Sequence, residues 1–73
     1  MNAVSPTHKK LGDRLKELRD KNKLTQEELA DKVGVDRSYM GFLERGEKNP
    51  TLKNLIKIAK VFNITLSDLF KTI

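Results

Sequence analysis

Apolar residues recur at helical spacing along most of this chain, and no segment shows the alternating pattern of a β-strand. Leu11, Leu15 and Leu18 fall at positions i, i+4 and i+7. This spacing predicts a first helix over about residues 8–21, with a cap within residues 5–7, where a proline is tolerated in the opening turn.

Residues 25–46 predict two short helices joined by a very short turn. Thr25 and Glu28 fit a T-x-x-E capping box, in which each residue's side chain bonds the other's backbone N–H. Gly34 is expected to end this helix in a left-handed conformation, and Asp36 to cap the next helix. So short a turn makes the two helices cross steeply, which is the helix-turn-helix geometry that places the second helix in a DNA major groove.

Two further helices are predicted after residue 50. Thr51 caps the first of them, and Thr65 or Ser67 caps the second, which is short. The expected buried stripe of the longer helix is Leu52, Leu55, Ile56, Ala59 and Phe62. We therefore expect an all-α fold, a compact five-helix domain over residues 7–73 that ends in a dimerisation helix and follows a flexible tail over residues 1–6.

The amino-acid composition limits the kinds of function that the protein is expected to have. The chain has 73 residues and no cysteine, so it is expected to form one domain without disulfides or a thiolate metal site. No apolar run reaches the ~20 residues of a membrane span or resembles a secretory signal, which favours a cytoplasmic protein. The formal charge of +5 favours an anionic partner, most simply nucleic acid, although many basic proteins bind none.

Catalytic chemistry finds little support in the sequence. His8 is the only histidine and lies beside the predicted tail, so any nucleophile–histidine pair would have to be built around it. No spacing of His and acidic residues suggests a metal site, and no glycine-rich phosphate loop is present. We therefore expect no enzyme activity, no cofactor, no metal and no small-molecule substrate.

Two runs of the sequence carry a family resemblance. TQEELADKVGVDRSYMGFLERGEKNPTL and LIKIAKVFNITLSDLF resemble the lambda-repressor and Cro-like (Xre-type) helix-turn-helix family. The most specific positions are Gln26, Leu29, Ala30, Gly34, Leu43, Glu44, Gly46 and Pro50. The resemblance covers nearly all of residues 8–71 and implies a five-helix domain whose second and third helices bind DNA. Small members of this family commonly act as homodimeric transcription regulators.

The third helix is the expected recognition helix. We expect DNA base contacts from its outward positions, which are Arg37, Ser38, Gly41 and Phe42. Arg37 can present a bidentate fork to guanine, and Ser38 can bond a base edge or a phosphate. Alternatively, Arg37 is simply a solvated surface residue.

Gly41 and Phe42 are unusual on such a face. A glycine inside a helix costs about 1 kcal/mol relative to alanine. A close approach of Gly41 to DNA or to another helix would explain that cost, and neutral drift would too. Phe42 could pack against a thymine methyl group, or could be a core or dimer-contact residue.

A second set of residues is expected to contact DNA phosphates: Gln26, Tyr39, Arg45, Lys48, Asn49 and Lys53. The resemblance implies this role for Gln26, and the free N–H groups and positive dipole at its helix start agree with it. Tyr39 could instead cover the core. The remaining four would each be ordinary surface residues alone, and only their clustering suggests phosphate binding.

The resemblance also pairs Arg19 with Glu44 as a structural ion pair. Removing one partner would cost about 3–5 kcal/mol if the pair is buried. An exposed pair would contribute less than about 1 kcal/mol.

The C-terminal segment carries more apolar residues than one short helix needs. We expect Leu66, Phe70 and Ile73 to lie nearer a dimer interface than Leu69, unless all of them belong to the core. A dimer is expected because one such domain contacts few base pairs, whereas two can bind half-sites about 34–36 Å apart.

The expected function is that of a sequence-specific transcriptional regulator, a repressor or autoregulator. It would act as a homodimer on a palindromic operator through the major groove, so its partners are double-stranded DNA and a second copy. The alternative is an antitoxin-like or other protein-interaction module in which DNA binding is secondary.

Overall fold

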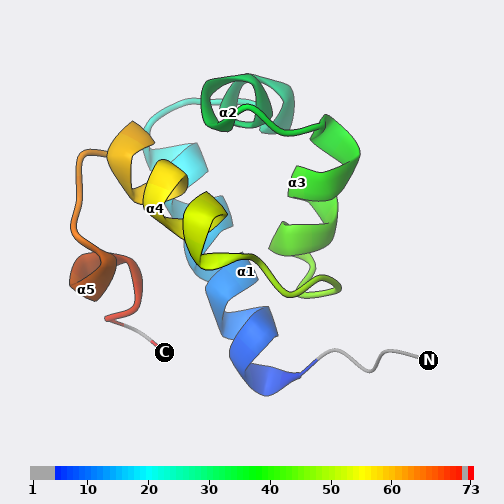
Figure 1. Cartoon of the computed structure of the whole chain (residues 1–73), viewed down its shortest axis with the longest axis vertical. Helices are drawn as coiled ribbons and strands as arrows, with labels where there is room; N and C mark the ends of the chain where they lie inside the picture. The colour runs from blue at the N-terminus through cyan, green and yellow to red at the C-terminus, as the bar shows by residue number, and fades with distance from the viewer. Residues whose placement is uncertain (1–4, 72) are drawn as a thin grey trace.

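The computed structural model describes residues 5–71 and 73, so residues 1–4 of the predicted tail lie outside the described residues. Over the described range the chain forms helices and no strand (Figure 1). The helices are α1 (Pro6–Lys21), α2 (Gln26–Val33), α3 (Arg37–Glu44), α4 (Leu52–Val61) and α5 (Leu66–Leu69). The predicted all-α, five-helix fold class is confirmed.

Helix α1 begins at Pro6, earlier than the predicted start near His8. The Ser5 hydroxyl accepts a hydrogen bond from the His8 N–H at 3.0 Å, which satisfies one free donor of the first turn. Pro6 fits the first helical position because its missing N–H would have no partner there. Ser5 and Pro6 are therefore part of the helix start.

Local signals position α2 and α3. The Thr25 hydroxyl accepts the Glu28 N–H at 3.1 Å, and the Glu28 carboxylate accepts the Thr25 N–H at 2.8 Å, so the capping box is complete. Gly34 ends α2 with φ 83°, a left-handed conformation that suits glycine. Asp36 occupies the N-cap position of α3, but its side chain makes no capping hydrogen bond. Residues 34–36 alone separate the two helices, which cross steeply (Figure 1).

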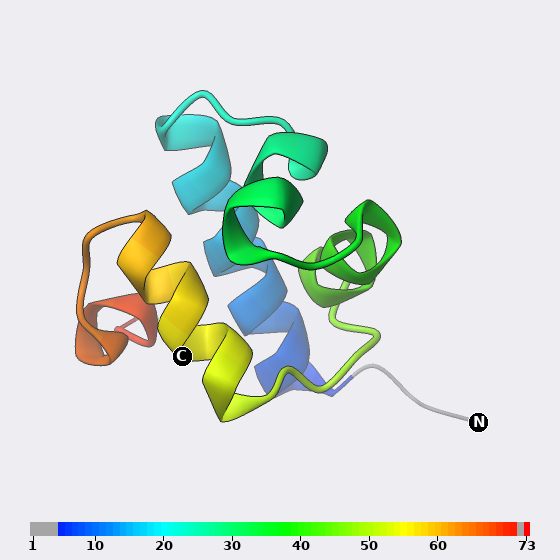
Figure 2. The same cartoon turned by 45° about the horizontal axis from the view of Figure 1, so that its top comes forward.

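Every helix contributes to one core. The largest fully buried side chains are Leu15, Leu29, Met40, Ile58 and Leu69, one from each helix in chain order. In Figure 2, α1 runs behind α2 and α4, with α3 on one side and α5 on the other. The core thus holds α3 against α1 and α2, and the face of α3 that points away from the core is exposed to solvent.

The buried face of α4 differs from the predicted stripe. Leu55, Ile58 and Ala59 are buried and Phe62 is partly buried. Leu52 and Ile56 are 63% and 38% exposed, so their predicted burial was wrong. Apolar residues occupy more than one face of α4, and its packing against α2 and α5 decides which face is covered.

Helix α5 docks on α1 through an arginine that the sequence did not single out. Thr65 caps α5 by accepting the Asp68 N–H at 3.0 Å, and Phe70 follows the last helical residue. Arg14, 8% exposed, donates from Nη2 to the Asp68 carbonyl at 3.0 Å and from Nη1 to Glu17 at 3.0 Å. This buried guanidinium therefore links the first and last helices.

No helix among the described residues combines the length and apolar character that crossing a membrane requires.

Candidate nucleic-acid interface

The outward face of α3 presents three of the four residues expected at DNA bases. Arg37 and Ser38, in the first turn, are exposed, and Phe42 is 36% exposed one turn later. Met40 and Leu43 point into the core from the opposite side. The short junction and core packing therefore hold α3 with its N-terminal turn directed outward.

Gly41 is buried, unlike the other three residues. An ideal Cβ atom on Gly41 would lie 3.2 Å from Arg45 Nη1 and 3.7 Å from Gln26 Oε1. These two side chains cover the Gly41 backbone, so its surface is not open as the sequence suggested. A base contact by Gly41 stays a prediction that requires both side chains to move.

Two cationic side chains lie close to the Phe42 ring near the end of α3. Arg45 Cζ lies 5.0 Å from the ring centroid, and Lys48 Nζ lies 5.5 Å from it. Cations at these distances are attracted to the negative face of an aromatic ring. Arg45 and Lys48, which are predicted to contact phosphates, therefore lie beside Phe42, which is predicted to contact a base.

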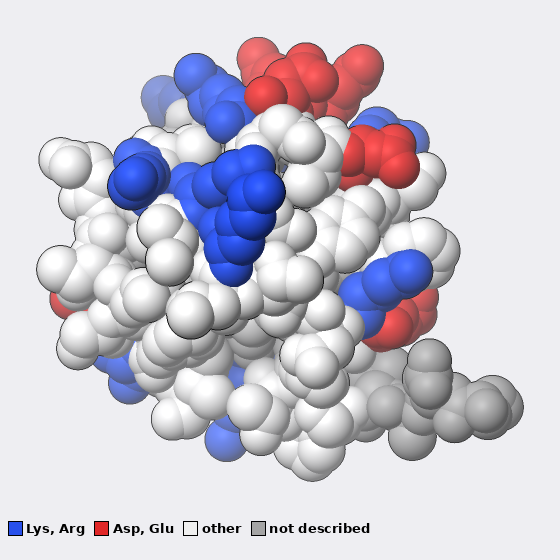
Figure 3. Space-filling view, viewed as in Figure 1, with Lys and Arg blue, Asp and Glu red and all other residues white. Residues whose placement is uncertain are grey.

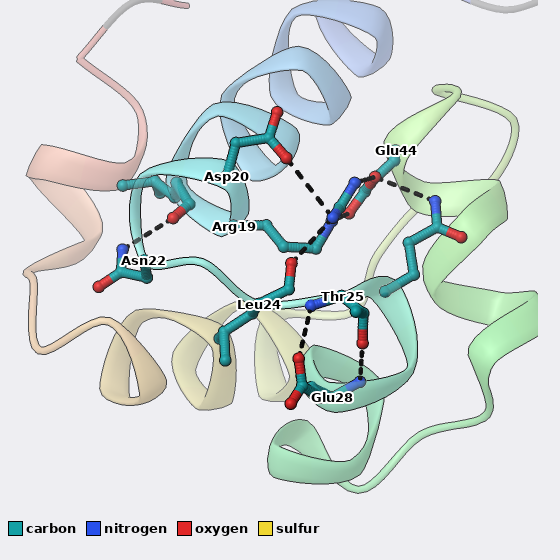
Figure 4. A network of polar contacts seen from close by, with 9 residues as sticks. Arg19, Asp20, Asn22, Leu24, Thr25, Glu28 and Glu44 are labelled. Carbon is teal, nitrogen blue, oxygen red and sulfur yellow. Dashed lines mark hydrogen bonds and ion pairs between the residues drawn. The ribbon is translucent and has the colours of Figure 1, made fainter.

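Glu44 is the centre of a buried polar network (Figure 4). Arg19 donates from Nε to Glu44 Oε2 at 2.8 Å and from Nη2 to Oε1 at 3.1 Å. The side chains of Arg19 and Glu44 are 13% and 4% exposed, so the expected ion pair is present and mostly buried. The hydrogen bond to Glu44 raises the pKa of Arg19 above its ordinary value.

Gln26 joins the same network from the first turn of α2. Its side-chain amide donates from Nε2 to Glu44 Oε1 at 3.0 Å. Arg19 also donates from Nη1 to the Leu24 carbonyl at 2.9 Å, just before α2 (Figure 4). The start of α2 is therefore fixed beside α1 and α3, where its free N–H groups favour a phosphate.

A recess beside Gln26 adds two residues that the sequence analysis missed. Lys9 and Lys16 of α1 line this recess together with Arg45. Lys9 pairs with Asp13 at 2.7 Å on the same helix. The two lysines lie at positions i and i+7 of α1, so their shared helix face was a signal that could have identified them.

The remaining predicted phosphate contacts have different surroundings. Tyr39 packs against the core and its hydroxyl accepts from Asn54 Nδ2 at 3.2 Å, which supports the alternative that it covers the core. Asn49 Oδ1 lies 3.2 Å from His8 Nε2, while Lys53 is exposed in the first turn of α4. These residues are less closely grouped than Arg45 and Lys48.

Charge is unevenly distributed over the surface. In Figure 3 acidic side chains gather over α2, whereas basic side chains are spread over several parts of the same face. Glu27 and Glu28 lie in the first turn of α2, where acidic residues stabilise the positive end of the helix dipole. Within the described residues, no group of acidic and histidine side chains is placed to hold a metal ion.

The C-terminal residues divide between core and surface. Leu69 is fully buried, and Leu66 and Phe70 pack against the core while remaining partly exposed. Ile73 is 40% exposed. The single chain thus leaves apolar area exposed at Leu66, Phe70 and Ile73, and their place at a dimer interface stays a prediction.

A short junction between two helices, with the second helix exposed along one side, defines a helix-turn-helix DNA-binding protein. The helix-turn-helix family HTH_3 matches residues 15–69. The chain belongs to this lambda-repressor and Cro-like (Xre-type) family of DNA-binding transcriptional regulators.

Several relatives are regulators by name. An uncharacterized HTH-type transcriptional regulator from Archaeoglobus fulgidus is 54% identical over 57 residues, which span 78% of this chain and 80% of that protein. The control protein C.MunI from a Mycoplasma species is 43% identical over 65 residues, 88% of each chain. The crystal structure of the restriction-modification controller protein C.AhdI from Aeromonas hydrophila matches with a TM-score of 0.83 and 46% identity, covering 86% of this chain and 96% of that one.

Proposed function

We propose that this protein is a homodimeric repressor that binds a palindromic operator, including one at its own promoter, by inserting α3 into the major groove. The observation that carries the proposal is the exposed first turn of α3, held outward by the short junction and by the buried Met40 and Leu43. As such a regulator it would act in the cytoplasm. The relatives named as control proteins support a regulatory role.

Three exposed residues of α3 are proposed to contact bases. Arg37 would bond guanine O6 and N7 through its two-pronged guanidinium, and Ser38 would bond a neighbouring base edge or phosphate. Phe42 would pack against a thymine methyl group, since about a third of its surface is open at 36% exposure. Gly41 would reach a base only after the side chains above it move.

We propose that residues around α3 contact DNA phosphates. Gln26 and the free N–H groups of α2 would bind one phosphate, and the cations at the end of α3 would bind others. The proposed set is Gln26, Tyr39, Arg45, Lys48, Asn49 and Lys53, joined by Lys9 and Lys16 at the recess.

Dimerisation is proposed through the C-terminal surface. Leu66, Phe70 and Ile73 all retain exposed apolar area there. A symmetric contact between two such surfaces would bury apolar area that is exposed in the single chain. Two α3 helices could then contact half-sites about 34–36 Å apart.

A fluorescence anisotropy titration against the protein's own upstream region tests this function. Affinity for the operator should exceed that for a shuffled fragment by about 10³-fold or more. The slope of log affinity against log salt should be about −0.9 for each phosphate neutralised. Equal affinity for the two fragments at every salt concentration would reject the proposal of sequence-specific regulation.

A further inference from the structure

We propose that Gly41 is a positioning residue, whose missing side chain leaves the space in which the Arg45 guanidinium is held ready for a DNA phosphate. This inference rests on the proposed function, because it assigns a role within the same DNA-binding surface. It explains why a glycine occupies the middle of an eight-residue recognition helix, where glycine is a poor helix former.

The space beside Gly41 is filled by Arg45. Arg45 lies four residues after Gly41, so the two positions are adjacent on the surface of α3 and its C-cap. A Cβ atom at residue 41 would approach Nη1 of Arg45 to 3.2 Å and Cζ to 3.9 Å. The first distance is shorter than an ordinary van der Waals contact, so any side chain at residue 41 must displace the guanidinium.

Two further groups hold Arg45 in place. The Phe42 ring centroid lies 5.0 Å from Cζ, and Glu47 Oε1 accepts from Nε at 3.1 Å. The Arg45 side chain is nevertheless 54% exposed. The guanidinium is therefore restrained by Phe42 and Glu47 and is still accessible to a ligand.

The position of Arg45 suits a phosphate at the start of α2. The same Cβ position on Gly41 lies 3.7 Å from Gln26 Oε1, so the Arg45 and Gln26 side chains both approach this glycine. A phosphate bound at the α2 N-terminus would thus lie beside a guanidinium whose rotamer freedom is already reduced. Restraint in the free protein lowers the ordering cost of binding.

Two substitutions test this role in graded fashion. Gly41→Ala should displace the guanidinium slightly, whereas Gly41→Leu should fill its space. Both residues are better helix formers than glycine, so thermal stability should be kept or raised. DNA affinity should nevertheless fall for Gly41→Leu by roughly 3- to 10-fold, as for Arg45→Ala, and by less for Gly41→Ala.

The loss should carry the signature of a phosphate contact. The salt slope should decrease by about 0.9 per bound subunit in both Gly41→Leu and Arg45→Ala. Lys60→Ala is the matched control, because it removes one exposed positive charge from the far end of α4. That variant should retain the wild-type affinity and slope.

A double-mutant cycle separates indirect action from direct contact. In an Arg45→Ala background, Gly41→Leu should cause no further loss of affinity. An equal loss in both backgrounds would show that residue 41 affects DNA binding independently of Arg45, by direct contact or through Gln26, and would overturn the inference. Unchanged DNA affinity and salt slope in both Gly41 variants would also overturn it. In that case, sequence-specific binding by the wild-type protein would still support the proposed function.

A measurement without DNA completes the test. The Arg45 Nε–H resonance in the free protein should be shifted by the Phe42 ring current, and Gly41→Leu should move it toward the value of a free arginine. An unmoved resonance in a folded Gly41→Leu protein would contradict the positioning role.

Discussion

Glu44 shows how a single residue connects the fold to the proposed DNA-binding surface. Its carboxylate belongs to α3, yet it accepts hydrogen bonds from Arg19 of α1 and Gln26 of α2. Three helices are therefore joined at one buried charge. Such a charge is tolerated because it is paired and hydrogen-bonded, and it becomes costly when a partner is removed.

Arg19→Met should strongly destabilise the protein. It leaves the Glu44 carboxylate, 4% exposed, without its main cationic partner. We expect the free energy of unfolding in urea to fall by about 3 kcal/mol or more. Lys9→Met, which removes a pair whose side chains are 53% and 60% exposed, should cost less than about 1 kcal/mol. Similar losses for both variants would mean that burial does not set the energy of the Arg19–Glu44 pair.

Arg37→Ala should relax specificity at one base position. Its exposed guanidinium is proposed to bind guanine, so the loss should be about 1–3 kcal/mol on the preferred base and small on the others. A panel of operators with single-base changes measures this difference. A uniform loss across the panel would instead identify Arg37 as a phosphate contact.

At the scale of the helices, the sequence predicted the features that depend on neighbouring residues, and it failed for those that depend on tertiary packing. The capping box of α2 and the left-handed Gly34 depend on neighbouring residues, so sequence alone located both. The exposure of Leu52 and Ile56 depends on how α4 is rotated against α2 and α5. Only the tertiary structure contains that information.

The same distinction applies to the candidate site. Helical periodicity placed Arg37, Ser38 and Phe42 outward, and the structure agrees. It also placed Gly41 outward, but the neighbouring Arg45 side chain folds over it. Periodicity specifies the direction of a position on a helix and contains no information about which side chain covers it.

Acid should weaken the capping box at the start of α2. The hydrogen bonds from Thr25 hold the pKa of Glu28 below its ordinary value of 4.5, so the ionised form stabilises the folded state. This contribution is present above pH 4.5 and is lost as pH falls through the lower folded-state pKa. Thermal midpoints of wild type and Glu28→Gln should therefore differ above that pH and converge in acid. A difference that stays constant across the acid range would contradict this linkage.

At the scale of the whole molecule, the elements proposed to recognise DNA differ from those proposed to form the dimer. Helix α3 lies on one side of α1, and α5 lies on the other (Figure 2). Arg14 joins α1 to α5 through the Asp68 carbonyl and so fixes the orientation of the C-terminal helix. A dimer formed there would leave both recognition helices free to contact DNA.

Ile73→Asp and Phe70→Asp should weaken dimerisation. Each puts a charge on the proposed apolar interface, where it would be buried without a partner. Sedimentation equilibrium should show a shift toward monomer, while Lys60→Ala keeps the wild-type distribution. Phe70 also packs against the core, so Ile73→Asp, at a residue 40% exposed, is the cleaner variant. An unchanged distribution for it would place the interface elsewhere.

The most direct test of major-groove recognition by α3 is binding to an operator in which guanines are replaced by 7-deazaguanine. This base lacks the N7 acceptor in the major groove, while its pairing and its minor-groove edge are unchanged. We predict that substitution at the guanine bound by Arg37 weakens wild-type binding by about 1–3 kcal/mol and has little effect on Arg37→Ala. Wild-type affinity that is unchanged by replacing every operator guanine would contradict recognition of guanine in the major groove.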